Sequence, residues 1–331
     1  MCYQPFTGKN LSLAESFFPY CDRQCSRSHL QHHSLKNQIE MRSATKKITV
    51  IGLGNMGAAI ARLYLNDGYQ VTVWNRNKAK ASGLVELGAT LTETPEAAIA
   101  ASAVTIICVY DYKASRDILN HAAVGAVLEG KTLIQLTTGS PEDAHIAEQW
   151  VTAHGAAYLD GAIQVAPDQM AQPDTTILFS GKRETFDEQA KLLSVLGGGN
   201  TYLDGNIGAA AVMDMATLSY LYGAYLGFLQ GVLFAESAGL DLTVYAEIVA
   251  RMSGGVGQFL QHQGKAISDN NFSVTQSPMA ISVEAVDRIV DAARTAGLNP
   301  VLPELAAGLL HKAADAGFGH EELAALIKVL R

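Results

Sequence analysis

A single carboxylate lies inside a long stretch of apolar and uncharged residues. The segment "GAAAVMDMATLSYLYGAYLGFLQG" runs from Gly208 to Gly231, and its one charged side chain is Asp214. Helical spacing by four places Asp214, Leu218 and Tyr222 on one face. A buried carboxylate is costly unless it has a partner or a chemical task. An acid and a phenol on one helix face therefore indicate proton transfer or the binding of a cation.

Two interpretations of Asp214 remain open at this level. A buried carboxylate stabilises a protonated iminium ion, whereas it opposes the alkoxide that forms when a ketone accepts a hydride. The residue type thus favours reduction of C=N over C=O. The alternative is a helix cap, in which Asp214 accepts a hydrogen bond from a backbone N–H near the helix start. Tyr222 lies among many aromatic residues and could equally belong to a core.

The elements that would support hydride chemistry begin with a glycine-rich turn. In "KKITVIGLGNMGAAIARLYLNDGYQVTVWNRNKAK" an apolar strand over 48–51 leads into a G-x-G-x-x-G motif, a helical pattern and a second strand over 70–74. Such glycines allow a tight turn and the approach of a pyrophosphate to the helix N-terminus. We expect the motif itself to bind a dinucleotide: Gly52, Leu53, Gly54, Asn55, Met56 and Gly57.

The end of the second strand indicates which dinucleotide is bound. Enzymes that use NAD usually carry Asp or Glu there, but this chain has Asn75, Arg76 and Asn77, with Lys80 just beyond. A guanidinium holds a 2′-phosphate that a carboxylate would repel, so NADPH is the expected cofactor. The alternative is that Arg76 and Lys80 are ordinary solvated charges. Three residues after later strands are expected near the nicotinamide: Val109, Thr137 and Thr138.

Strand and helix patterns alternate up to about residue 205, which predicts an α/β domain with a doubly wound parallel sheet. The later segments, at 243–252, 279–296, 303–316 and 320–330, are helical in pattern. We therefore expect a Rossmann domain over 46–205, and a long interdomain helix with an all-α domain over 206–331. Residues 1–45 are expected to be a disordered tail without a signal peptide. Cys21, Cys25, His29, His32 and His33 match no common zinc spacing, and no metal site is expected.

Composition excludes several classes of partner. The chain has 331 residues and a formal net charge of −8, with no basic face for nucleic acid. Only Cys108 of its four cysteines lies outside the first 25 residues, so there is no disulfide framework and a cytoplasmic location is expected. The uncharged stretch after Asp214 is long enough to cross a bilayer, but its polar residues argue against a membrane. Gly223, Gly227 and Gly231 recur every fourth residue, which suggests close packing by another subunit.

From about Lys46 to its end the chain resembles the imine reductases, a branch of the β-hydroxyacid dehydrogenase superfamily with 6-phosphogluconate dehydrogenase-like architecture. The matching stretches are "VIGLGNMGAAIA", "VWNRNKAKA", "DGAIQVAP", "GAAAVMDMATLSYLYG" and "ALIKVL". The resemblance implies an NADPH-dependent oxidoreductase that reduces cyclic imines to amines. It also implies a domain-swapped homodimer, with Asp214 as proton donor or iminium anchor and Tyr222 beside it.

The resemblance further implies that Ile163, Gln164 and Met252 contact the substrate. The hydroxyacid branch carries Lys and Asn where this chain has Asp214 and Leu218, which argues against that branch. A β-hydroxyacid, ketone or aldehyde reductase that uses another proton donor is the alternative. The reductive aminase subset carries Asn where this chain has Thr138, which weakens the case for reductive amination. A third interpretation, an NADPH-binding regulator without turnover, stays open because fold does not establish function.

Overall fold

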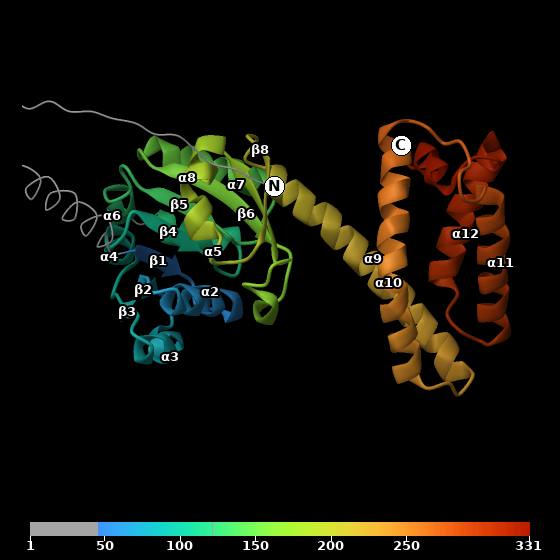
Figure 1. Cartoon of the computed structure of the whole chain (residues 1–331), viewed down its shortest axis with the longest axis horizontal. Coiled ribbons are helices and arrows are strands. Elements are labelled where there is room, and N and C mark those ends of the chain that lie inside the picture. Colours follow the sequence, from blue (N-terminus) through green and yellow to red (C-terminus); the bar gives the residue numbers. More distant parts are fainter. Residues whose placement is uncertain (1–45, 121) are drawn as a thin grey trace, which may run out of the picture. The chain divides into compact units, whose positions relative to one another are not determined.

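The computed structural model describes residues 46–120 and 122–331. The expected tail, with its cysteine and histidine cluster, lies outside the described residues. The chain divides into two compact units, with the boundary between Ala211 and Val212, and each is described by itself (Figure 1). In the described ranges, no group of three or more His, Cys, Asp or Glu side chains is placed to hold a metal ion.

The N-terminal unit is built on one sheet in the order β3-β2-β1-β4-β5-β6-β7-β8. Neighbours from β3 to β6 are parallel, as expected from the alternating pattern. The strands are β1 (Lys47–Ile51), β2 (Gln70–Trp74), β3 (Thr90–Leu91), β4 (Val104–Ile107), β5 (Thr132–Gln135), β6 (Ala157–Ile163), β7 (Thr176–Gly181) and β8 (Gly199–Asp204). The expected Rossmann-type α/β architecture is thereby confirmed.

One part of that expectation needs correction, because the sheet is not parallel throughout. β7 is antiparallel to β6, and β8 is parallel to β7, so the last two strands run against the rest. The connection from β6 to β7 contains only the short helix η2 (Pro167–Gln169). A parallel neighbour needs a crossover of a dozen or more residues, usually a helix, whereas an antiparallel neighbour does not.

Helices cover both faces of the sheet (Figure 1). They are α2 (Asn55–Asn66), η1 (Lys78–Ala81), α3 (Ser82–Glu86), α4 (Pro95–Ala100), α5 (Tyr112–Leu119), α6 (Ala122–Gly125), α7 (Pro141–Ala153) and α8 (Arg183–Leu193). Successive side chains of a strand point to opposite faces. Along β1, Ile48 and Val50 therefore enter one buried cluster and Ile51 enters another.

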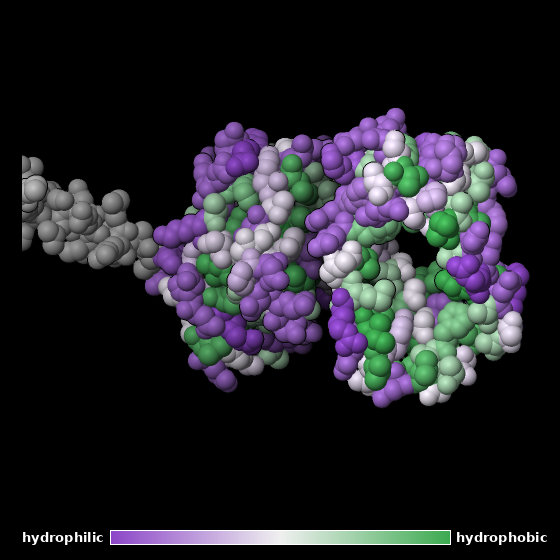
Figure 2. Space-filling model, turned by 45° about the vertical axis from the view of Figure 1, so that its right-hand side comes forward, coloured by the Kyte–Doolittle hydropathy of each residue, from purple (hydrophilic) through white to green (hydrophobic). Residues whose placement is uncertain are grey.

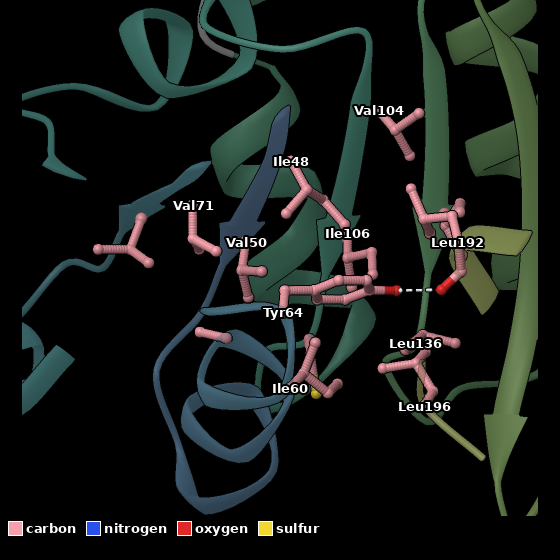
Figure 3. Close-up of a cluster of buried hydrophobic side chains, with 14 of the residues drawn as sticks. Ile48, Val50, Ile60, Tyr64, Val71, Val104, Ile106, Leu136, Leu192 and Leu196 are labelled. Carbon is pink, nitrogen blue, oxygen red and sulfur yellow. Dashed lines mark hydrogen bonds between the residues drawn. The ribbon is translucent and has the colours of Figure 1, made fainter. Parts of the chain in front are cut away.

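The first of these clusters ties α2 and α8 to the sheet (Figure 3). Tyr64 of α2 is fully buried beside Ile48, Val50 and Ile106, and its hydroxyl donates a 3.1 Å hydrogen bond to the Leu192 carbonyl oxygen. A buried hydroxyl without a partner would be costly. This bond therefore lets a large aromatic ring fill the core that holds α2, the helix that follows the glycine turn.

The C-terminal unit is helical, as expected. Helix α9 (Ala209–Ser237) enters it and is followed by α10 (Leu242–Ser268), α11 (Met279–Thr295), α12 (Val301–Ala313), η3 (Ala314–Phe318) and η4 (Leu323–Val329). A small core joins the last helices to the loop after α10. The same unit also contains a buried carboxylate, Glu322. It accepts hydrogen bonds from the backbone N–H of Thr275 at 2.8 Å and from Gln263 Nε2 at 3.3 Å.

Helix α9 is apolar but largely exposed within one chain. Its exposed large apolar side chains include Tyr220, Leu221, Tyr222, Tyr225, Leu226 and Leu229, and green, hydrophobic residues are visible on the C-terminal unit in Figure 2. The apolar surface of α9 is therefore not covered within a single chain. Among the described helices, α9 is the one long and apolar enough to cross a membrane, a statement of length and composition only.

Candidate functional site

The glycine turn after β1 is shaped for close backbone approach. Gly52 has a φ of +94°, and a β-carbon there would lie 2.1 Å from the Cys108 carbonyl oxygen. A β-carbon on Gly57 would lie 2.0 Å from the Gly52 carbonyl oxygen, whereas one on Gly54 would meet nothing within 4 Å. Gly54 is the N-cap of α2 and offers no side-chain cap. The first N–H groups of α2 thus face an open side, which fits a dinucleotide pyrophosphate.

A cavity of about 720 Å³ opens over this turn. Ten of the residues that the sequence predicted for cofactor binding line it: Gly52, Leu53, Gly54, Asn55, Met56, Gly57, Asn75, Arg76, Lys80 and Val109. They come from the carboxyl ends of β1, β2 and β4, which meet at one edge of the parallel sheet. This is where open α/β sheets bind their ligands.

Positive charge gathers where β2 ends. Arg76 and Lys80 line the cavity and take part in none of the ion pairs found between described residues, whereas Lys78 pairs with Glu93. Asp117 is the one carboxylate among the lining residues, and Lys113 neutralises it at 3.0 Å. The end of the cavity beside β2 therefore suits an anionic group. It is less suited to an unphosphorylated ribose, whose hydroxyls would be bound by a carboxylate.

Two predicted residues after β5 lie elsewhere. Thr137 and Thr138 are not among the residues that line the cavity. Thr137 is 3% exposed, and its hydroxyl accepts a 3.0 Å hydrogen bond from the Val109 backbone N–H. Its side chain therefore joins the ends of β4 and β5. Cys108, beside Val109, lines the cavity, and burial raises the pKa of its thiol to about 11.

Sequence reasoning did not assign six lining residues to the site: Trp74, Pro95, Cys108, Ala114, Asp117 and Ile118. A signal for some of them was present. Asp111 caps α5 by accepting from the Ala114 N–H at 2.7 Å, and Ala114, Asp117 and Ile118 follow at helical spacing on one face. Tyr110 is 94% exposed, so its ring lies at the open side of the cavity.

A buried polar cluster lies beneath the loops that follow β4 and β5. Tyr112 donates a hydrogen bond to Asp160, and its hydroxyl lies 3.3 Å from that of Tyr158. Burial raises the pKa of both tyrosines well above the ordinary value. A β-carbon on Gly139 would lie 2.1 Å from the Tyr112 ring. The cluster therefore supports the loop after β5 with neutral phenols.

Asp214 is the sixth residue of α9 and is 6% exposed. The N–H groups without a partner inside a helix belong to its first turn, and two of them bond to residues before α9 here. The Ala209 N–H donates to the Asn206 carbonyl oxygen at 3.0 Å, and the Ala210 N–H donates to Ser180 Oγ at 3.1 Å. Asn206 and Ser180 therefore bond the first two N–H groups of α9.

The remaining predicted residues fall in both units. Tyr222 is 65% exposed and lies two turns beyond Asp214, about 12 Å along the helix axis. Met252 lies within α10 and is 58% exposed. Ile163 ends β6 and packs against the first core cluster. The backbone N–H of Gln164 donates to the Thr176 carbonyl oxygen at 3.0 Å.

Two family models cover the described chain. Residues 47–207 match the NAD binding domain of 6-phosphogluconate dehydrogenase, and residues 206–331 match the C-terminal domain of the NADPH-dependent reductive aminase-like proteins. An NADPH-dependent reductive aminase from Aspergillus oryzae is 33% identical over 292 residues, which are 87% of this chain and 98% of that protein.

Solved structures agree with these matches. An imine reductase from Myxococcus stipitatus in complex with NADP+ is 30% identical, with a TM-score of 0.81, over 86% of this chain and 100% of that one. A reductive aminase from Aspergillus terreus in complex with NADPH and ethyl levulinate is 34% identical, with a TM-score of 0.79, over 87% and 100%.

Proposed function

Because the chain belongs to the imine reductase and reductive aminase family of NAD(P)H-dependent oxidoreductases, we propose that it is an NADPH-dependent reductase of cyclic imines. The product is the corresponding amine. The observation that carries this proposal is Asp214, a buried carboxylate in a helix whose next charged residue is Glu236. Such a group suits a cationic C=N substrate and opposes a developing alkoxide.

The cavity over the glycine turn holds the cofactor in this proposal. The turn and the N-terminus of α2 bind the pyrophosphate, and Arg76 and Lys80 hold the 2′-phosphate. When bound, reduced nicotinamide supplies the hydride that the C=N carbon gains. The NADP+ and NADPH complexes of the two relatives support this choice.

Asp214 acts on the nitrogen of the substrate. Protonated, it donates its proton to the imine nitrogen; ionised, it holds the iminium ion by charge. In either state the π electrons of the C=N bond end as the lone pair of the amine nitrogen, while the carbon gains the hydride. Tyr222, on the same face of α9, adds a phenol that orients the substrate.

The test follows the consumption of NADPH with 2-methyl-1-pyrroline as substrate. Asp214→Asn is expected to lower kcat roughly 100-fold or more, the usual contribution of a general acid, while the Kd for NADPH stays unchanged. Asp291→Asn, an exposed aspartate on α11, is the matched control. Turnover of a keto acid or aldehyde instead of the imine would overturn the proposal. Binding of NADPH without any turnover would favour a regulator.

The proposal includes a homodimer, in which the exposed side of α9 packs against a second copy of this chain. Gly223 and Gly227 have open space where a β-carbon would be, and they lie four residues apart on one face. Exposed tyrosine and leucine side chains flank them. A helix of this kind allows the backbone of a neighbouring helix to approach closely, so the apolar surface is buried in a homodimer.

A further inference from the structure

The amide of Asn75 makes one hydrogen bond to each of two segments that line the cavity. Its Oδ1 accepts from the Leu53 N–H of the glycine turn at 3.0 Å, and its Nδ2 donates to the Asn77 carbonyl oxygen at 2.8 Å. The two bonded groups come from segments more than twenty residues apart. Asn75 therefore connects the phosphate turn to the segment that contains Arg76.

The Asn77 carbonyl oxygen is also held from the other side. The Lys80 N–H donates to it at 3.2 Å, and the Asn77 side chain accepts from the Ala79 N–H at 3.1 Å. The backbone from Asn75 to Lys80 thus forms a closed turn, and both cavity-lining cations, Arg76 and Lys80, belong to it. The amide of Asn75 is the tether that joins this turn to the rest of the site.

Only a group with both an acceptor and a donor can make these two bonds. An amide has both, whereas an ionised carboxylate only accepts. Aspartate at this position would keep the bond from Leu53 but would place an acceptor 2.8 Å from the Asn77 carbonyl oxygen. The turn would then lose its tether.

We infer that Asn75 is a positioning residue for 2′-phosphate recognition, which acts by holding the turn that presents Arg76. The inference rests on the proposed function, because it assumes that Arg76 binds the 2′-phosphate. In this inference the Asn75 amide does more than avoid the charge repulsion that a carboxylate would exert on the 2′-phosphate. A neutral residue that cannot make these two hydrogen bonds should therefore weaken discrimination between ligands with and without the 2′-phosphate.

The experiment compares two ligands that differ only in the 2′-phosphate, adenosine 2′,5′-bisphosphate and adenosine 5′-monophosphate. Calorimetric Kd values are measured for the wild-type chain, Asn75→Ala, Arg76→Ala and the double variant. Asn75→Ala is expected to bind the bisphosphate roughly five- to tenfold more weakly, with little change for the monophosphate. In the Arg76→Ala background the same change should no longer alter discrimination, because a residue that acts through another loses its effect with it.

Each other outcome has one meaning. Equal weakening of both ligands by Asn75→Ala would overturn the inference and indicate general damage to the turn, which thermal unfolding beside the exposed control Asn66→Ala would detect. Full discrimination in Asn75→Ala would overturn it as well. If the wild-type chain does not distinguish the two ligands, the proposed NADPH selection fails, independently of Asn75.

Discussion

Gly57 lies against Gly52 so closely that a β-carbon on Gly57 would come within 2.0 Å of the Gly52 carbonyl oxygen. The contact joins the first turn of α2 to the end of β1. It explains why a side chain is excluded at the third glycine of the motif. The packing of the helix on the strand requires it.

Gly57→Ala is expected to destabilise the N-terminal unit by roughly 2 kcal/mol or more, since a backbone atom would have to move. Gly54→Ala is the matched control, because its β-carbon meets no atom within 4 Å. It should lose much less thermal stability, since alanine is only a poorer N-cap than glycine, but bind NADP+ less well, as the methyl group enters the cavity. Thermal unfolding with and without NADP+ separates the two. Equal stability of both variants would contradict the packing argument.

Arg76→Ala is expected to raise the KM for NADPH roughly 10- to 100-fold and to leave the KM for NADH nearly unchanged. The reason is the loss of a charge-assisted hydrogen bond to the 2′-phosphate. Lys78→Ala serves as control, because Lys78 pairs with Glu93 and does not line the cavity. Steady-state kinetics with both cofactors gives the answer. A parallel rise for NADPH and NADH would assign Arg76 to the shared part of the cofactor.

Gly227→Leu should convert the proposed homodimer to a monomer, because a large side chain would keep the partner helix at a distance. Sedimentation velocity measures the mass. Gly308→Leu, at an exposed and open position of α12, should leave the mass unchanged. Should the wild-type chain sediment as a monomer and bind to lipid vesicles, the dimer proposal is wrong, and α9 would be a membrane-binding helix.

Acid is expected to weaken the C-terminal unit through Glu322. Burial raises the pKa of this carboxyl, but hydrogen bonds from the Thr275 and Gln276 backbone N–H groups and from the Gln263 side chain, together with the charge of His262, lower it, so the net pKa is below its ordinary value. Such a group stabilises the fold above its unfolded pKa, and this contribution is lost as pH falls through the folded pKa.

The melting temperature should therefore fall as pH decreases below about 4.5, the range where an ordinary glutamate titrates. Glu322→Gln should flatten this part of the pH profile, whereas Glu284→Gln, which removes an exposed ion pair with Arg288 at 3.9 Å, should not. Calorimetric scans of the full chain at several pH values test this. Identical slopes for the wild type and Glu322→Gln would assign the acid sensitivity to other carboxyls.

Elements with their own end signals were predictable from local sequence. The strand over 70–74 has the bounds that the sequence predicted, and α7 (Pro141–Ala153) begins at a local signal of the same kind. The helix begins there because Ser140 and Asp143 form a reciprocal cap, in which the Asp143 N–H donates to Ser140 Oγ at 3.1 Å and the Ser140 N–H donates to Asp143 Oδ2 at 3.2 Å.

The prediction for α10 was wrong at its end. The pattern ended at Met252, but the helix continues to Ser268. Gly254, Gly255 and Gly257 come shortly after Met252 and lower the intrinsic helix propensity. Tertiary packing overrides this preference, since α10 is held further along by contacts such as Gln263 with Glu322.

The sequence by itself determined which chemistry is available to this protein. A glycine turn after an apolar strand, an arginine without a carboxylate at the next strand end, and one acid in an apolar helix all depend on residues close together in the chain. Their meaning could be derived from spacing and side-chain type. The comparisons then established the family that the motifs indicated.

Only the tertiary structure decided which segments far apart in the sequence contact one another. It turned the Thr137 hydroxyl toward Val109, made α5 a second side of the cavity, and reversed β7 and β8. It also placed Ser180 beside the start of α9, where its Oγ accepts a hydrogen bond from the N–H of Ala210, thirty residues later in the chain. These outcomes depend on contacts between segments far apart in sequence, which compete for the same hydrogen-bonding groups, and no local pattern specifies the result.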